Sequence, residues 1–203
     1  MIRVLLILLP ALTALTPSPL AGPREVIRTA TDAVVQILHD ASLDATQKTS
    51  RAEGVVDRHL DTATVSQLVL ARTWRSLDDG QREAFVGEFR RYLVTTYWNN
   101  VNGLEIDAIT IDDDREEARG DWTVETTVRS ARFGDTTVDY RLRREEGAAG
   151  TPGEWRIIDI LVEDISLISN FRAQFKEVLA NKSFDDLMTV LREKNAKSAG
   201  SGT

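Results

Sequence analysis

The sequence predicts an α+β fold in which a curved four-stranded antiparallel sheet is covered by helices. Three observations support this prediction. The chain has 203 residues, of which 42% are hydrophobic, and this size and composition suit a single domain with a substantial core. Apolar residues recur at helical spacing up to about residue 97 and again from about residue 168. Between residues 104 and 163 apolar and polar residues alternate, which is typical of strands with one buried face.

The first 21 residues have the three regions of a secretory signal peptide. A basic start with Arg3 precedes an apolar run of residues 4–15, and prolines and small residues follow up to Ala21. The apolar run is too short for a transmembrane helix, which needs about 20 residues. We expect export and cleavage after Ala21, which leaves a single domain of residues 22–197 and a disordered tail of residues 198–203. The alternative, a buried N-terminal helix, is disfavoured by Arg3 and the prolines.

Four helical segments are expected before the sheet. They span Arg24 to Asp40, Thr46 to Leu60, Thr64 to Leu77, and Asp78 to about Asn99. Asp78 and Gln81 fit a capping box at the start of the fourth segment, and Gly103 suits a left-handed position after its end. The fourth segment carries one apolar, largely aromatic stripe, formed by Phe85, Phe89, Tyr92, Leu93 and Tyr97.

Four strands follow, joined by short turns. They span Leu104 to Ile111, Trp122 to Arg132, Thr136 to Arg144, and Trp155 to Glu163. The acidic run Asp112–Asp114 is interpreted as a turn. Alternation places one set of residues on the inward face of the sheet: Val124, Val128, Val138, Tyr140, Leu142, Ile158, Ile160 and Val162. After the sheet we expect a helix whose apolar stripe begins at Ile168 and a last helix capped by Ser183.

Charge and composition argue against several classes of function. Without Arg3 the exported chain has 24 basic and 32 acidic residues, a net charge of −8, which disfavours binding to nucleic acids and to anionic membranes. The absence of cysteine excludes cysteine nucleophiles and thiolate metal sites. His39 and His59 have no acid or nucleophile at a recognisable spacing, and the Asp112–Asp114 run lacks the glycine and terminal glutamate of a calcium loop. We therefore predict no enzyme, no metal and no cofactor.

Two segments resemble a known family. One runs from Leu68 to Leu93, and the other reads W-R-I-I-D-I-L-V-E-D-I-S-L-I followed by N-F-R-A-Q-F between Trp155 and Phe175. Both resemble the toluene-tolerance, or MlaC-type, family of periplasmic phospholipid carriers, and the order of elements fits over about residues 24 to 195. The chain departs from the pattern at Asp164, where a glycine often precedes the Ile-Ser pair.

The resemblance implies a cystatin- and nuclear-transport-factor-like cone with a lipid cavity between sheet and helices. It implies a soluble, monomeric periplasmic protein that carries phospholipid between an outer-membrane complex and an inner-membrane transporter complex, and so maintains the lipid asymmetry of the outer membrane. A hopanoid or another lipid is the first alternative ligand. A periplasmic adaptor with a filled core, which binds only proteins, is the second alternative.

If the chain carries lipid, the inward strand face and the helix stripes are the expected cavity wall. The candidates are Phe85, Phe89, Tyr92, Leu93, Tyr97, Val124, Val128, Val138, Tyr140, Leu142, Ile158, Ile160, Val162 and Ile168. Two acyl chains need a cavity of about 1,000 Å³, at the upper end of the range for ligand pockets. Arg90 is the candidate for the phosphate of the head group, because a guanidinium can donate two hydrogen bonds to phosphate. The alternative for Arg90 is an ion pair with an acid such as Glu83 or Glu88.

Overall fold

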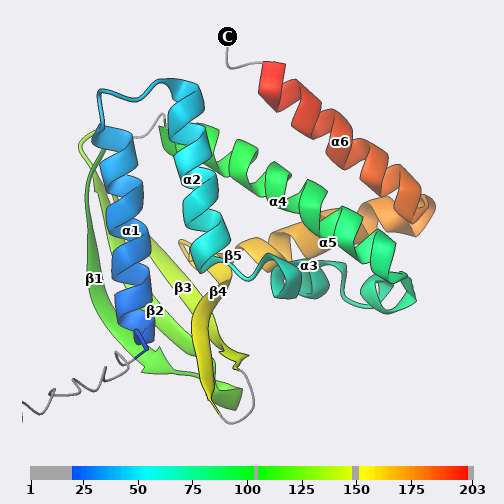
Figure 1. Cartoon of the computed structure of the whole chain (residues 1–203), viewed down its shortest axis with the longest axis horizontal. Helices are drawn as coiled ribbons and strands as arrows, with labels where there is room; N and C mark the ends of the chain where they lie inside the picture. Colours follow the sequence, from blue (N-terminus) through cyan, green and yellow to red (C-terminus); the bar gives the residue numbers. More distant parts are fainter. Residues whose placement is uncertain (1–19, 103–104, 148–150, 201–203) are drawn as a thin grey trace, which may run out of the picture.

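The computed structural model describes residues 20–102, 105–147 and 151–200, and they form an α+β fold with an open antiparallel sheet. Figure 1 shows the order of the elements along the chain. The helices are α1 (Pro23–His39), α2 (Ala45–His59), α3 (Thr62–Leu70), α4 (Asp79–Asn102), α5 (Leu167–Asn181) and α6 (Phe184–Gly200), and the strands are β1 (Ile106–Glu116), β2 (Trp122–Ser130), β3 (Gly134–Glu146), β4 (Pro152–Val162) and β5 (Ile165–Ser166).

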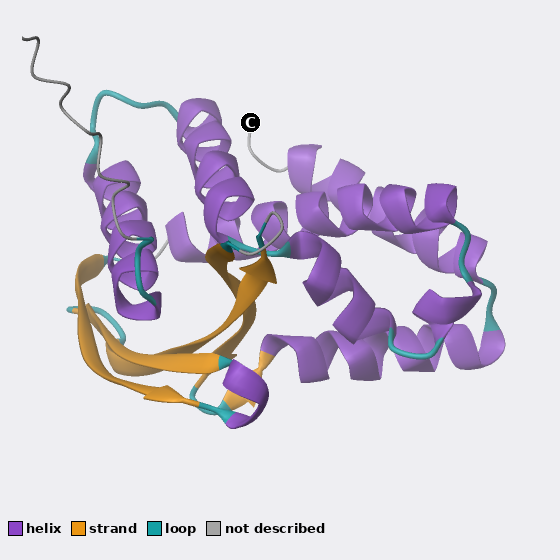
Figure 2. Ribbon diagram, turned by 60° about the horizontal axis from the view of Figure 1, so that its bottom comes forward, coloured by secondary structure: helices purple, strands orange, loops and turns teal. Residues whose placement is uncertain are grey.

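The strands follow one another in the sheet in chain order, from β1 to β5, and each pair is antiparallel. The sheet curves beneath α1 and α2, which stand side by side across one of its faces (Figure 2). The other four helices form a second group beside the sheet (Figure 1). The α+β class and the antiparallel order are confirmed. The expected cone is not confirmed, because the sheet is open, with β1 and β5 at its edges.

The sheet has five strands rather than the expected four. Glu163 and Asp164 both have positive φ, at 47° and 63°, so the chain reverses within two residues. Ile165 and Ser166 then pair back onto Val162 and Leu161. Aspartate tolerates the left-handed conformation better than most residues, so the turn forms without the glycine that the family pattern often has at residue 164.

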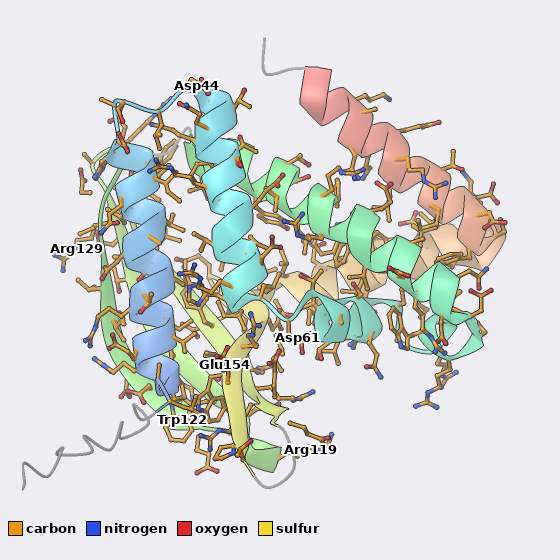
Figure 3. The ribbon with its side chains drawn as sticks, viewed as in Figure 1. Asp44, Asp61, Arg119, Trp122, Arg129 and Glu154 are labelled. Carbon is orange, nitrogen blue, oxygen red and sulfur yellow. The ribbon has the colours of Figure 1, made fainter. Side chains whose placement is uncertain are left out.

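The acidic run Asp112–Asp114 is part of β1, so its interpretation as a turn is wrong. Partners on other elements hold these side chains. Asp114 accepts hydrogen bonds from Arg24 in α1 at 2.8 Å and from the Trp122 indole at 3.0 Å, and Asp112 accepts one from Thr127 at 2.6 Å. Trp122 begins β2 at the end of the sheet that the first turn of α1 covers (Figure 3).

The predicted helix starts are confirmed more closely than the helix ends. Asp78 accepts a hydrogen bond from the Gln81 amide at 2.8 Å, and the Gln81 side chain accepts one from the Asp78 amide at 3.1 Å, which is the expected capping box. The helix expected to reach Leu77 instead ends at Leu70, because Ala71 takes a positive φ of 51° and interrupts the helical hydrogen bonds. A short 3₁₀ helix follows at Thr73–Ser76. Gly103 lies outside the described residues.

The last helix continues to Gly200, past the predicted start of the tail at residue 198, and residues 201–203 lie outside the described part. Ser183 caps this helix as expected, because its hydroxyl accepts a hydrogen bond from the Asp186 amide at 3.2 Å. Within the described ranges, no helix is long and apolar enough to cross a membrane.

Three groups of buried side chains fill most of the interior. We call them the helical core, the sheet core and the upper core. The helical core joins α3, α4, α5 and α6 and includes Phe85, Phe89, Phe171, Phe175 and Leu187. The sheet core joins α1 to the sheet through Val26, Ile27, Val124, Leu142 and Ile157. The upper core joins α1, α2 and α4 through Ile37, Ala52, Val94 and Trp98.

Candidate functional site

An apolar cavity of about 420 Å³ lies between the sheet and the helices α1, α2 and α4. The helical wall consists of Ala30, Thr31, Val34, Ala52, Val55, Val56, His59, Leu93, Val94, Tyr97, Trp98 and Val101. The opposite wall is the concave face of the sheet, with Ile106, Ile109, Val128, Ser130, Thr136, Val138, Tyr140, Ile157, Asp159, Ile160 and Val162. Leu60, Val65, Phe133, Gly134, Leu167 and Ile168 complete the lining.

The helical wall follows from the spacing of apolar residues in α1 and α2. Ala52, Val55, Val56 and His59 are separated by three or four residues, so they share one face of α2. That face lies over the sheet (Figure 1), and these four side chains line the cavity. Their spacing was available in the sequence, but none of them was among the predicted wall residues.

The cavity opens between the β2–β3 turn and the end of β4. Phe133 and Val162 line the cavity and are also 57% and 44% exposed. Gly134, the first residue of β3, is the third exposed lining residue, while the other described lining residues are buried or partly buried. We call Phe133, Gly134 and Val162 the mouth of the cavity.

Eight of the fourteen predicted wall residues line the cavity: Leu93, Tyr97, Val128, Val138, Tyr140, Ile160, Val162 and Ile168. The other six lie elsewhere in the fold. Phe85, Phe89 and Tyr92 belong to the helical core or pack against it. Val124 and Leu142 are fully buried in the sheet core against α1. The sixth residue, Ile158, is 2% exposed and does not line the cavity.

A β-bulge explains the position of Ile158. Arg141 pairs with Asp159 and Leu142 pairs with Ile157, so Ile158 is an extra residue in β4 with no partner on β3. An extra residue shifts the alternation of side chains, and Ile157 rather than Ile158 therefore lines the cavity together with Ile160. Strict alternation along the sequence predicts the opposite.

Asp159 is the aspartate of the sequence motif, and it fixes the junction between β4, β5 and α5. It is 5% exposed. Its carboxylate accepts hydrogen bonds from the Ile160 amide at 2.9 Å, the Ser166 hydroxyl at 2.7 Å and the Ile168 amide at 3.2 Å. These bonds hold the start of α5, and with it Ile168, against the cavity. Asp159 therefore lines the cavity and also fixes the backbone that carries other lining residues of the motif.

Burial favours the neutral forms of two side chains in the cavity wall, the Tyr140 phenol and the His59 imidazole. Burial raises the pKa of the Tyr140 phenol to about 12. His59, at the end of α2, is 9% exposed, and burial lowers its pKa, with a further contribution from the charges of Arg58 and Arg156. A lowered pKa keeps the imidazole neutral in the folded protein at pH values where an exposed histidine is already protonated.

The His59→Leu variant tests this assignment through the pH dependence of stability. The unfolded chain protonates His59 near its ordinary pKa of about 6.5, whereas the folded protein takes up this proton only at lower pH. The wild-type free energy of unfolding should therefore fall as the pH drops below about 6.5. Urea unfolding at pH 7.5 and pH 5.5 should show a smaller acid-side loss for His59→Leu than for wild type. An equal loss in both proteins, or removal of the loss by His39→Gln instead, would refute the assignment.

Arg90 does not line the cavity. Its guanidinium forms a bidentate pair with the Asp57 carboxylate of α2, with one bond of 2.7 Å, and lies 3.8 Å from Glu53. The Asp57 hydrogen bond raises the pKa of Arg90, and the charges of Asp57 and Glu53 add to this effect. The expected alternative, an ion pair with an acid, is what the structure contains, although the partners are not Glu83 and Glu88. Among the described residues no group of three potential metal ligands occurs.

Comparisons with known proteins agree with this fold. A phospholipid-binding protein from Ralstonia solanacearum, solved in complex with a phospholipid, has a similar fold, with a TM-score of 0.73 and 23% sequence identity. The similarity covers 88% of this chain and 99% of that protein. No curated protein sequence matches the chain significantly. The family model described as MlaC protein matches residues 28–193, nearly the whole of the described fold. The chain therefore belongs to the MlaC family.

Proposed function

We propose that this protein is a periplasmic carrier that holds a phospholipid by its acyl chains in the cavity and moves it between outer- and inner-membrane complexes. The observation that carries the proposal is an almost wholly apolar cavity with an apolar mouth, in a chain whose net charge without the leader is −8. Membership of the MlaC family and the phospholipid bound by the Ralstonia protein support it. Export to the periplasm rests on the leader of residues 1–21.

The energetics explain why a carrier needs an enclosed cavity. A two-chain lipid has on the order of 30 methylene groups, each worth about 0.8 kcal/mol when buried, which is roughly 24 kcal/mol in total. A bilayer already provides this burial. A soluble protein can exchange lipid with a membrane only if it hides nearly as much of the chains as the bilayer does. The cavity, rather than any polar contact, is therefore the main source of affinity.

The cavity volume sets a condition on loading. At about 420 Å³ the cavity is well below the roughly 1,000 Å³ expected for two enclosed chains, the upper end of the range for ligand pockets. We infer that α1 and α2 move away from the sheet when both chains enter. These two helices lie over the concave face of the sheet, apart from the helical core (Figure 2). Their movement would enlarge the cavity without disturbing the helical core.

Native mass spectrometry of protein purified from the periplasm of a Gram-negative host tests the proposal. We expect one bound lipid per chain, and extraction should identify it as a glycerophospholipid. A hopanoid as the bound lipid would contradict the assignment of the ligand class. Protein that carries no lipid, and takes none from phospholipid vesicles, would refute the carrier function and favour an adaptor. The Val128→Trp variant is the matched control, because its tryptophan side chain should fill the cavity.

A further inference from the structure

Most of the large exposed apolar side chains of the described residues lie at or beside the mouth of the cavity. Four large apolar side chains are exposed, and three of them are Phe133, Val162 and Ile165. Ile165 is 67% exposed and pairs with Val162 across the β4–β5 turn. A lipid whose chains fill the cavity leaves through this mouth, so its glycerol and phosphate would lie beside Phe133 and Val162.

One cation stands at this mouth. The Arg132 guanidinium carbon lies 5.0 Å from the centroid of the Phe133 ring, in a cation–π arrangement. The Ser130 hydroxyl accepts hydrogen bonds from the Arg132 and Phe133 amides, both at 3.3 Å, and these bonds fix the turn that carries both side chains. No carboxylate of the described residues forms an ion pair with Arg132. Its charge is therefore available to a ligand.

The neighbouring arginine, Arg129, differs from Arg132 both in its position and in having a carboxylate partner. Arg129, on β2, lies 3.8 Å from the Asp135 carboxylate. It projects outward from the sheet, away from α1 and α2 (Figure 3), and it does not line the cavity. Arg129 and Arg132 are three residues apart and equally charged, so Arg129 is a control for the general effect of charge near the mouth.

We propose that Arg132 binds the phosphate of the lipid head group at the mouth of the cavity, an inference that rests on the proposed carrier function. A guanidinium donates paired hydrogen bonds to phosphate oxygens. Asp135 at the start of β3 and Glu163 and Asp164 in the β4–β5 turn are exposed acids, and they would repel an anionic head group without a local cation. Arg90 is engaged by Asp57, so it cannot take this role without breaking that pair.

The test compares Arg132→Gln with Arg129→Gln, which remove the same charge. Each variant is titrated with phosphatidylglycerol and with a diacylglycerol that has the same acyl chains but no phosphate, by displacement of a fluorescent lipid. We expect Arg132→Gln to weaken phosphatidylglycerol binding about fivefold, the size of one exposed ion pair, and to leave diacylglycerol binding unchanged. The effect should shrink in 0.5 M NaCl. Arg129→Gln should change neither affinity by more than about twofold.

Three results would overturn the proposal. The first is an equal loss of phosphatidylglycerol affinity in both variants, which would indicate a general charge effect. The second is an equal loss for phosphatidylglycerol and diacylglycerol in Arg132→Gln, which would place Arg132 in the apolar rim. The third is binding of inorganic phosphate that Arg132→Gln removes while its lipid affinities stay unchanged, which would indicate a site for free phosphate. If wild-type protein binds neither lipid, the carrier function itself fails, and that result differs from all three.

Discussion

Val128→Trp is expected to abolish most lipid binding and to leave the fold nearly as stable as wild type. Val128 lines the cavity and is only partly buried, so the indole ring can extend into open space instead of displacing packed neighbours. A ring in the cavity takes the place of acyl methylenes, each worth about 0.8 kcal/mol. We expect lipid occupancy, measured by native mass spectrometry, to fall at least tenfold. The free energy of unfolding in urea should change by less than about 1 kcal/mol.

Val124→Trp is the matched control. Val124 lies on the same strand and the same face four residues earlier, but it is fully buried in the sheet core, which also contains Ile27 of α1. Overpacking at such a site costs about 1–3 kcal/mol or more. The protein that remains folded should still carry lipid. If instead Val128→Trp destabilises the fold as much as Val124→Trp and the amount of bound lipid is unchanged, Val128 is an ordinary core residue and our map of the cavity is wrong there.

This pair of valines also shows how far the sequence could predict the site. Alternation along β2 places both residues on the inward face, and that prediction is correct. Alternation does not tell where along the face the packing ends. That depends on the helices. Ile27 of α1 is buried in the same sheet core as Val124, whereas α1, α2 and α4 border an open cavity at Val128. The sequence therefore predicts the face of the sheet, whereas the tertiary arrangement decides which part of it is open.

Other differences between prediction and structure have local causes that a single sequence conceals. The bulge at Ile158 exchanges one isoleucine for its neighbour in the cavity wall, and two adjacent isoleucines give no sign of it. The aspartates of residues 112–114 are typical of a turn, but Arg24 and Thr127 stabilise them within a strand, and these partners are distant in the sequence. The stripe of α2 has the same spacing whether it packs against a core or faces a cavity. Such a pattern indicates a buried face but does not distinguish a packed core from a cavity wall.

The apolar, largely aromatic stripe of α4 is predicted correctly, but its residues have two different roles in the structure. Towards the start of the helix, Phe85 and Phe89 are fully buried in the helical core. Towards its end, Leu93 and Tyr97 line the cavity. The stripe runs continuously along one side of the helix, so the sequence predicts a single role for it. The second role arises where α4 passes behind α2 (Figure 1), because Leu93 and Tyr97 still contact the helical core there but also border the cavity.

Phe89→Ala is accordingly expected to be the most destabilising of these changes and to leave the binding site intact. The Phe89 ring has no exposed surface, and its centroid lies 5.4 Å from that of Phe85, 5.0 Å from that of Phe171 and 5.6 Å from that of Phe175. Truncation removes all three ring contacts and leaves a void among rigid neighbours. Such changes typically cost about 3–5 kcal/mol, a large part of the stability of a domain of this size. Urea unfolding should show this loss directly.

Tyr97→Ala, two turns further along the same helix, completes the experiment. Tyr97 is partly buried and borders the cavity, so its truncation enlarges an existing space and should cost less stability than Phe89→Ala. Lipid occupancy of folded Phe89→Ala, measured below its unfolding transition, should equal that of wild type, whereas Tyr97→Ala should alter lipid affinity. Loss of lipid from a still stable Phe89→Ala protein would mean that acyl chains reach the helical core. The cavity would then extend between α4 and α5, and the division of α4 into a structural half and a binding half would be wrong.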